Sequence, residues 1–233
     1  MEEIQKLSDL VASNLRNNNV QYDNDDLNKT KDIIQEYQGK LNAISKLDPN
    51  IYSDIKKYFE AIDIRNAVKQ TFDFINENLN NTDERFKKII IKQGKVVGSA
   101  IDMILPEYLS KNNKLGYTFI HGNDSCDTDC VCTEDTFYST EIKTTSDKIG
   151  NISGSYTNSG IGKGRKYKYD MQHFYIFITT EKSAENNLEI NDIYIGKLCA
   201  SDWSYSNSKG SNSVYLTKNV RDSHFINLKY LEM

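Results

Sequence analysis

Three residues in the middle of the chain have the types and spacing needed to hydrolyse a phosphodiester bond. These are Asp129, Glu141 and Lys143. Two carboxylates supply the hard oxygen ligands that Mg²⁺ prefers, and substrate phosphate oxygens would complete its octahedron. A bound metal lowers the pKa of a water and neutralises charge that develops on the phosphate. A lysine beside it can orient or polarise the attacking water. The grouping therefore indicates metal-assisted hydrolysis.

A predicted β-hairpin would bring these residues together. Strand-like segments cover residues 129–132 and 137–143, and polar residues between them indicate a turn. With the turn centred near Asp135, Asp129 lies opposite Glu141. Two carboxylates from different strands then meet at one edge of a sheet.

The second strand directs the lysine toward the same place. Glu141 and Lys143 are two positions apart, so their side chains leave the same face of the strand. The Ile142 side chain then points into the core, and its carbonyl oxygen is a further candidate metal ligand. A Glu-x-Lys pair on a strand is also common as a solvated ion pair of little energetic value. The acid twelve positions earlier, across a predicted turn, favours the functional interpretation.

Helices are predicted before this motif and strands around and after it. Apolar residues recur at spacings of three and four in the first part of the chain. The predicted helices cover residues 4–15, 33–44, 51–61, 64–79 and 95–109. After Lys114, short apolar or alternating runs are separated by turn residues. Beyond the hairpin, the predicted strands cover residues 117–120, 173–179, 193–198 and 214–216. This order predicts an α+β or mixed α/β fold, with a helical N-terminal region, residues 1–94, and a core, residues 95–233.

The motif resembles the signature of the PD-(D/E)xK nuclease superfamily, in which an Asp opens one strand and Glu-x-Lys follows on the next. Thr128 stands where the superfamily usually has Pro, which leaves Asp127 as an alternative ligand to Asp129. The resemblance is closest to type II restriction endonucleases of the EcoRV-like and ScaI-like branch. It covers the chain from about Val96 onward.

This resemblance implies a restriction-endonuclease-like fold, with a central mixed β-sheet flanked by helices. It implies sequence-specific hydrolysis of double-stranded DNA, with 5′-phosphate and 3′-hydroxyl ends that we expect to be blunt. Asp129, Glu141 and the Ile142 carbonyl would hold one or two Mg²⁺ ions. In this branch an acid on the preceding helix assists, and Asp102 is the candidate here, with Glu107 as a rival.

A restriction enzyme that cuts both strands of a palindrome calls for a homodimer. The helical region of residues 1–94 lies far from the motif in sequence, so it is the candidate for the dimer interface and for a scaffold. Two alternatives also fit the motif: a repair or structure-specific nuclease of the same superfamily, and a non-catalytic DNA-binding protein.

Candidate DNA contacts lie in polar and basic segments around the motif. Residues 143–173 contain six basic residues against two acidic ones, although the whole chain has a formal charge of -4. Cations contact phosphates, and Ser and Asn side chains can read bases in the grooves. The candidates are Asn123, Lys148, Ser155, Tyr156, Lys163, Arg165, Lys166, Lys168, Asn207, Lys209 and Asn212.

The cysteines and the N-terminal residues indicate whether a zinc site is present and in which cellular compartment the protein works. A zinc site that includes Cys126, Cys130 and Cys132 stays open, although the last two are expected to point into the core as small apolar groups. The first residues lack a basic stretch followed by an apolar one, and no apolar run is long enough for a membrane span. We therefore expect no membrane partner and a reducing, cytoplasmic compartment.

Overall fold

The structure is a computed structural model that describes residues 13, 24–122, 128–146, 153–155, 172–183, 187–205 and 213–231. The chain divides into two compact units, residues 1–46 and 47–233. This division falls earlier than the boundary expected between residues 94 and 95, because the helices after residue 47 pack with the sheet. The helix predicted over residues 4–15 lies outside the described residues, apart from Ser13.

Aspartate side chains cap the N-termini of three consecutive helices. The helices are α2 (Asn24–Ile44), α3 (Pro49–Ala61), α4 (Ile64–Asn80), α5 (Glu84–Lys92), α6 (Gly94–Lys111) and α8 (Lys218–His224). Asp48, Asp63 and Asp83 accept hydrogen bonds from backbone amides in the first turns of α3, α4 and α5. Such caps satisfy amides that have no partner within the helix, so they mark where each helix begins.

Two sheets follow the helices, which confirms the α+β fold. The six-stranded sheet has the order β1 (Phe119–His121), β2 (Cys130–Cys132), β3 (Thr140–Thr145), β5 (His173–Lys182), β6 (Leu188–Leu198) and β9 (Phe225–Asn227). The pair β3 and β5 is parallel and the other neighbours are antiparallel, so the sheet is mixed. The three-stranded sheet has the order β4 (Ser153–Ser155), β8 (Ser213–Leu216) and β7 (Trp203–Tyr205).

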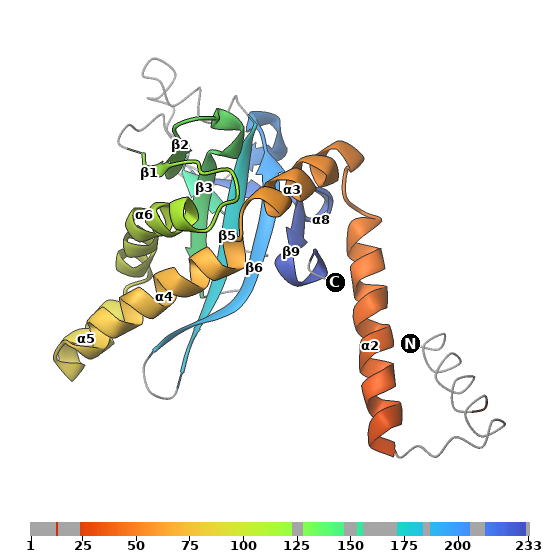
Figure 1. Ribbon diagram of the computed structural model, residues 1–233, viewed down its shortest axis with the longest axis horizontal. Coiled ribbons are helices and arrows are strands. Elements are labelled where there is room, and N and C mark those ends of the chain that lie inside the picture. The colour runs from red at the N-terminus through yellow and green to blue at the C-terminus, as the bar shows by residue number, and fades with distance from the viewer. Residues whose placement is uncertain are drawn as a thin grey trace. The chain divides into compact units, whose positions relative to one another are not determined.

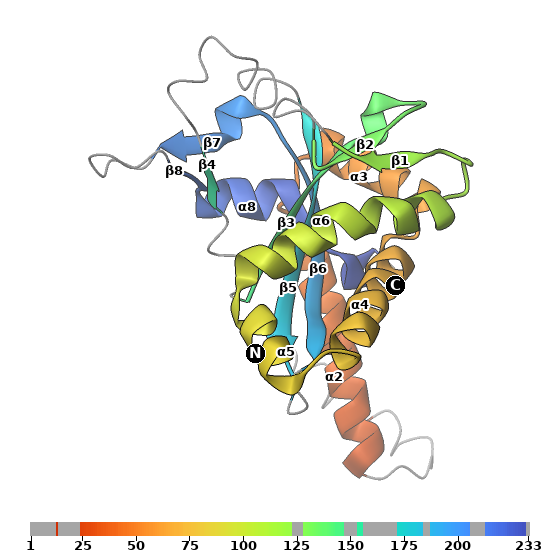
Figure 2. The same ribbon diagram turned by 90° about the vertical axis from the view of Figure 1, so that its left-hand side faces the viewer.

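Helices α3, α4 and α6 lie on one face of the larger sheet (Figure 1, Figure 2). There α3 and α4 contact β6, and α6 contacts β1, β2 and β3. Gly98 lets α6 come close to β3, since a Cβ atom at that position would lie 3.0 Å from Thr144 Oγ1. On the opposite face an apolar cluster includes Tyr175, Phe177 and Trp203, and it packs the smaller sheet against β5 and β6.

The structure differs from the sequence-based elements at several ends. The second hairpin strand begins at Thr140 instead of residue 137, because the 3-10 turn η1 (Thr136–Tyr138) precedes it, with the Phe137 amide bonded to Asp135 Oδ1 at 2.9 Å. Strand β6 starts at Leu188, five residues earlier than predicted. Helix α5 and strands β4, β7 and β9 were not predicted as separate elements. Within the described residues, no helix is both long and apolar enough to cross a membrane.

Candidate active site

The hairpin has the predicted register. Cys130 of β2 lies opposite Thr140 of β3 in an antiparallel pair. In an antiparallel pair, one step back along β2 corresponds to one step forward along β3, so Asp129 lies opposite Glu141. Both cysteines of β2, Cys130 and Cys132, are buried, whereas Val131 between them is half-buried. The thiols therefore anchor β2 in the core, as expected, and Asp129 enters the sheet in a fixed position.

The three motif side chains meet around one ammonium group. Lys143 Nζ lies 2.6 Å from Glu141 Oε1 and 3.1 Å from Asp129 Oδ2. It also donates to the Ile142 carbonyl oxygen at 3.0 Å. Asp129 Oδ2 in turn accepts a hydrogen bond from the Ile142 amide at 3.0 Å, and these two bonds orient the carboxylate toward β3. Three oxygens, two of them carboxylate oxygens, therefore converge on one cation.

The arrangement keeps Lys143 charged. Burial by itself would lower the pKa of its ammonium group, but the negative charges of Glu141 and Asp129 and their hydrogen bonds outweigh it. The net effect raises the pKa of Lys143 above its ordinary value. Its side chain is still 29% exposed, whereas Glu141 is only 6% exposed. Lys143 is thus a permanent cation at neutral pH that can reach a ligand in solvent.

Two hydroxyl groups hold the hairpin backbone around these residues. Thr128 is buried, and its Oγ1 donates to the Cys130 carbonyl oxygen at 2.8 Å, which spans the backbone of Asp129. Ser139 Oγ accepts a hydrogen bond from the Cys132 amide at 3.0 Å and so links the two strands beside the turn. The sequence pattern marked Thr128 only as a departure from the usual Pro, because a side-chain bond to the backbone leaves no trace in residue spacing.

A third contact fixes β3 from the helix-covered face. The buried Tyr58 hydroxyl lies 2.6 Å from Thr140 Oγ1, and Thr140 Oγ1 itself donates to the Tyr138 carbonyl oxygen at 2.9 Å. Tyr58 therefore donates to Thr140. Burial raises the pKa of the Tyr58 hydroxyl, so it remains a proton donor. This bond connects α3 to the residue directly before Glu141.

The donor set fits a hard divalent cation. Asp129, Glu141 and the Ile142 carbonyl offer oxygens alone, and Lys143 Nζ shows that all three can face one positive charge. Among the described residues, no group of three or more His, Cys, Asp or Glu is placed to hold a metal ion. Two carboxylates are the number that Mg²⁺ often takes from a protein, with waters and substrate phosphates as the other ligands. A zinc site that involves Cys126 lies partly outside the described residues.

The alternative acids have different surroundings. The Asp102 carbonyl oxygen lies 3.1 Å from His121 Nδ1, which connects α6 to β1. Glu107 pairs with Lys111 at 2.6 Å on the exposed side of the same helix. Asp127 lies outside the described residues. A metal-binding role for Asp102 stays a prediction.

One of the eleven predicted DNA contacts lies in a described element. Ser155 ends β4, where it pairs with Ser213 of β8 in the smaller sheet. The other ten lie outside the described residues: Asn123, Lys148, Tyr156, Lys163, Arg165, Lys166, Lys168, Asn207, Lys209 and Asn212. Their part in DNA binding stays a prediction.

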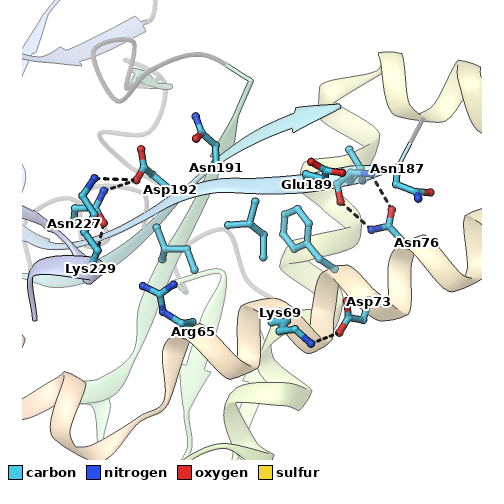
Figure 3. Close-up of a pocket in the computed structure, with 14 residues that line it drawn as sticks. Arg65, Lys69, Asp73, Asn76, Asn187, Glu189, Asn191, Asp192, Asn227 and Lys229 are labelled. Atoms are coloured by element: carbon cyan, nitrogen blue, oxygen red, sulfur yellow. Dashed lines mark hydrogen bonds and ion pairs between the residues drawn. The ribbon is translucent and has the colours of Figure 1, made fainter. Parts of the chain in front are cut away.

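Cavities lie elsewhere in the molecule. A cavity of about 600 Å³ lies between α4 and the first half of β6, lined by polar side chains that include Arg65, Glu189 and Asp192 (Figure 3). Across it, the Asn76 side chain bonds both backbone groups of Leu188, each at 2.9 Å. A second cavity, of about 510 Å³, lies where α5 and α6 meet the end of β3. Neither is lined by the three motif residues, so cavity size does not locate the site.

The comparisons with known proteins agree with this geometry. The family model of the ScaI restriction endonuclease matches residues 55–229, well over half of the chain. The matched range begins within α3 and contains the whole hairpin with Asp129, Glu141 and Lys143. No curated protein and no solved structure matches the chain. With a mixed sheet, flanking helices and this motif at the expected strand ends, the chain belongs to the ScaI restriction endonuclease family.

Proposed function

We propose that this chain is a Mg²⁺-dependent, site-specific endonuclease that hydrolyses both strands of double-stranded DNA and leaves blunt 5′-phosphate and 3′-hydroxyl ends. Family membership provides the reaction class and the substrate. The single observation that carries the chemistry is the convergence of Glu141 Oε1, Asp129 Oδ2 and the Ile142 carbonyl on Lys143 Nζ. We place the activity in the cytoplasm, in keeping with the cysteine usage.

In this proposal Asp129, Glu141 and the Ile142 carbonyl hold one or two Mg²⁺ ions, with Asp102 as an accessory ligand. Mg²⁺, when bound there, supplies a water of lowered pKa and neutralises charge on the scissile phosphate. When these oxygens bind the metal, the donors of Lys143 would be released to bond the attacking water and a phosphate oxygen, and so to hold the water in line with the P–O3′ bond. Attack forms the new P–O bond and breaks P–O3′; the attacking water loses one proton and the leaving 3′-oxygen takes one up, so a 5′-phosphate and a 3′-hydroxyl result.

The remaining parts of the proposal concern binding. Basic residues between Lys143 and His173 would contact phosphates, and the Asn/Ser-rich segment of residues 204–213 would read bases. A homodimer would align two copies of the site with the two strands of a palindrome. Residues 1–94 would provide the dimer interface.

A DNA digest tests the proposal. The purified full-length chain is incubated with DNA of known sequence and Mg²⁺, and the fragment ends are mapped. We expect discrete fragments that disappear when the metal is chelated or when Glu141→Ala is used. Glu60→Ala, which changes an exposed acid on α3 far along the chain from the motif, should cut like the parent.

Other results of the same digest would contradict the proposal. If Glu141→Ala cuts as fast as the parent, the site assignment is wrong. Nicks, or cuts that depend on DNA shape rather than sequence, would favour a repair or structure-specific nuclease. Salt-sensitive DNA binding without metal-dependent cleavage would favour a binding protein.

A further inference from the structure

Helix α5 presents a basic row to solvent, formed by Arg85, Lys88 and Lys92. All three residues are exposed. They are three and four positions apart, so they lie on one side of the helix. Residues 83–95 contain five basic residues against two acidic ones, although the chain as a whole is acidic. A positive surface thus lies in the helical region, apart in sequence from the basic segment that follows Lys143.

The basic row differs from the lysines of the neighbouring helices. Exposed lysines of α3, α4 and α6 pair with acids one turn away, in Lys56–Glu60, Lys69–Asp73 and Lys111–Glu107. In the part of the chain that the structure describes, no acid forms an ion pair with the basic row, although Glu84 lies one turn before Lys88. Like charges one turn apart repel each other, so the row is unfavourable by itself and suits a partner with many negative charges.

The basic row ends at a cavity beside the strand that carries the motif. Lys92 lines the cavity of about 510 Å³ together with Lys182 and Ser146. Two lysines outnumber one acid, Glu181, among the lining residues that the structure describes. Ser146 lies three residues beyond Lys143, which is about 10 Å along a strand and corresponds to about three base pairs of duplex. The basic row thus lies near the proposed site without being part of it.

Helix α5 also lies toward the face of the sheet that carries the motif. Thr144 faces α6, because its Oγ1 lies 3.0 Å from the Cβ position of Gly98. Successive residues of a strand point to opposite faces, so Lys143 faces the smaller sheet. Figure 2 shows that α6 begins on the side of the smaller sheet, next to α5, whereas α4 lies on the other side. A duplex that brings a phosphate to Lys143 from this side can therefore continue along α5.

We propose that Arg85, Lys88 and Lys92 bind the sugar–phosphate backbone of the DNA duplex, outside the base pairs that the enzyme reads. The choice of DNA as the partner rests on the proposed function, whereas the choice of surface rests on the basic row. From Arg85 to Lys92 the helix rises by about 10 Å, the axial length of about three phosphates on one strand. Such contacts carry no sequence information, but they add affinity that falls as the salt concentration rises.

The salt dependence of DNA binding tests the proposal. Binding of the full-length chain to a duplex of about 30 base pairs is measured without divalent metal between about 50 and 200 mM salt. Lys88→Gln combined with Lys92→Gln removes two phosphate contacts, so the slope of log K against log[salt] should become shallower by about 2. Lys56→Gln combined with Lys69→Gln is the matched control, because these exposed lysines have acidic partners, and it should keep the parental slope. A parental slope for the first variant, or an equal loss in the control, would overturn the proposal.

Hydroxyl-radical footprinting tests the position of the contact. On a duplex whose cut position has been mapped, the parent should protect the backbone at the cut position and on its flanks. The Lys88→Gln and Lys92→Gln double variant should lose the protection of the flanks alone, and equal flanking protection in both chains would overturn the proposal. The salt slopes do not involve cleavage. The expected slopes without cleavage would therefore contradict the proposed function alone, and cleavage with equal slopes would contradict this inference alone.

Discussion

Two lysines of the same sheet each lie in a short ion pair, but in opposite surroundings. Lys197 Nζ lies 2.7 Å from Asp54 Oδ2, and its side chain is only 10% exposed. It faces the rings of Phe137 and Phe174, with centroids 5.0 and 5.2 Å away, on the face that α3 covers. Lys143 lies on the other face, among three oxygens, with a larger exposed fraction.

The difference separates a cation packed within the protein from one that a ligand could reach. Aromatic faces and one acid satisfy Lys197 within the protein, so nothing there can exchange for a ligand. Around Lys143 two carboxylates face one ammonium, so negative charge exceeds positive charge, and the Lys143 side chain borders solvent. An excess of carboxylate around a reachable cation is therefore a better sign of chemistry than the ion pair itself.

The strongest test of this difference between the two lysines is to remove the Lys143 charge. Lys143→Met keeps much of the side-chain length but provides no hydrogen-bond donor. We expect single-turnover DNA cleavage to fall by about 10²–10³-fold, the usual loss for one donor to a developing charge. DNA affinity, measured without divalent metal, should change far less. Cleavage at the parental rate would place Lys143 with Lys197 as a structural cation.

The reciprocal change should affect stability instead of cleavage. Lys197→Met removes the bond to Asp54 and both ring contacts, so we expect the free energy of unfolding to fall by about 1–2 kcal/mol. We expect a loss no larger than this because Asp54 is partly exposed and can be hydrated. Urea unfolding measures the loss. Cleavage per folded molecule should match that of the parent. A selective loss of cleavage would show that Lys197 serves the site.

A further test concerns Thr128, whose hydroxyl bonds the backbone on the far side of Asp129. Thr128→Val removes the bond to the Cys130 carbonyl but keeps the shape, and we expect cleavage to slow about tenfold, through kcat rather than KM. Thr128→Ser retains the hydroxyl and should restore the rate. Equal rates for the Val and Ser variants would show that the bond does not position Asp129.

The smallest expected effect is on the pH dependence of stability. The folded pKa of Lys143 is raised above its ordinary value of 10.5, so its stabilisation is complete below that pH and is lost as pH rises toward the folded pKa. Relative to Lys143→Met, the parent should lose about 1 kcal/mol of unfolding free energy between about pH 10.5 and 11.5. The difference between the two should be constant from pH 6 to 9. Urea titrations at each pH provide the comparison, and a difference that varies below pH 9 would contradict the assignment.

The sequence predicted the register of the hairpin better than the contacts that support the hairpin. The Asp129–Glu141 register followed from a turn centred at Asp135, because pairing across a hairpin depends on local spacing alone. The Lys197–Asp54 pair joins residues 143 positions apart, which no local pattern reveals. Whether Thr128 bonds the backbone depends on side-chain geometry, and residue type does not determine it.

The elements that were missed have physical reasons in common. Helix α5 has only nine residues, and one of its two buried side chains is Lys87, so burial there does not follow residue type. Strand β9 has three residues, and it exists because Phe225–Asn227 pair with β6, about thirty positions away. Short strands of this kind are stabilised by neighbours that a periodicity analysis does not see.

The two buried thiols of β2 allow local opening of the hairpin to be measured. A reagent can reach Cys130 or Cys132 only after β2 separates from the core, and burial raises the pKa of both thiols and so keeps little reactive thiolate. Their rate of alkylation in the native protein would thus measure how often the strand after Asp129 opens. In a chain with Cys126 and Cys199 replaced by Ser, the rate of inactivation by a thiol reagent would then report local unfolding, without any sulfur taking part in the reaction.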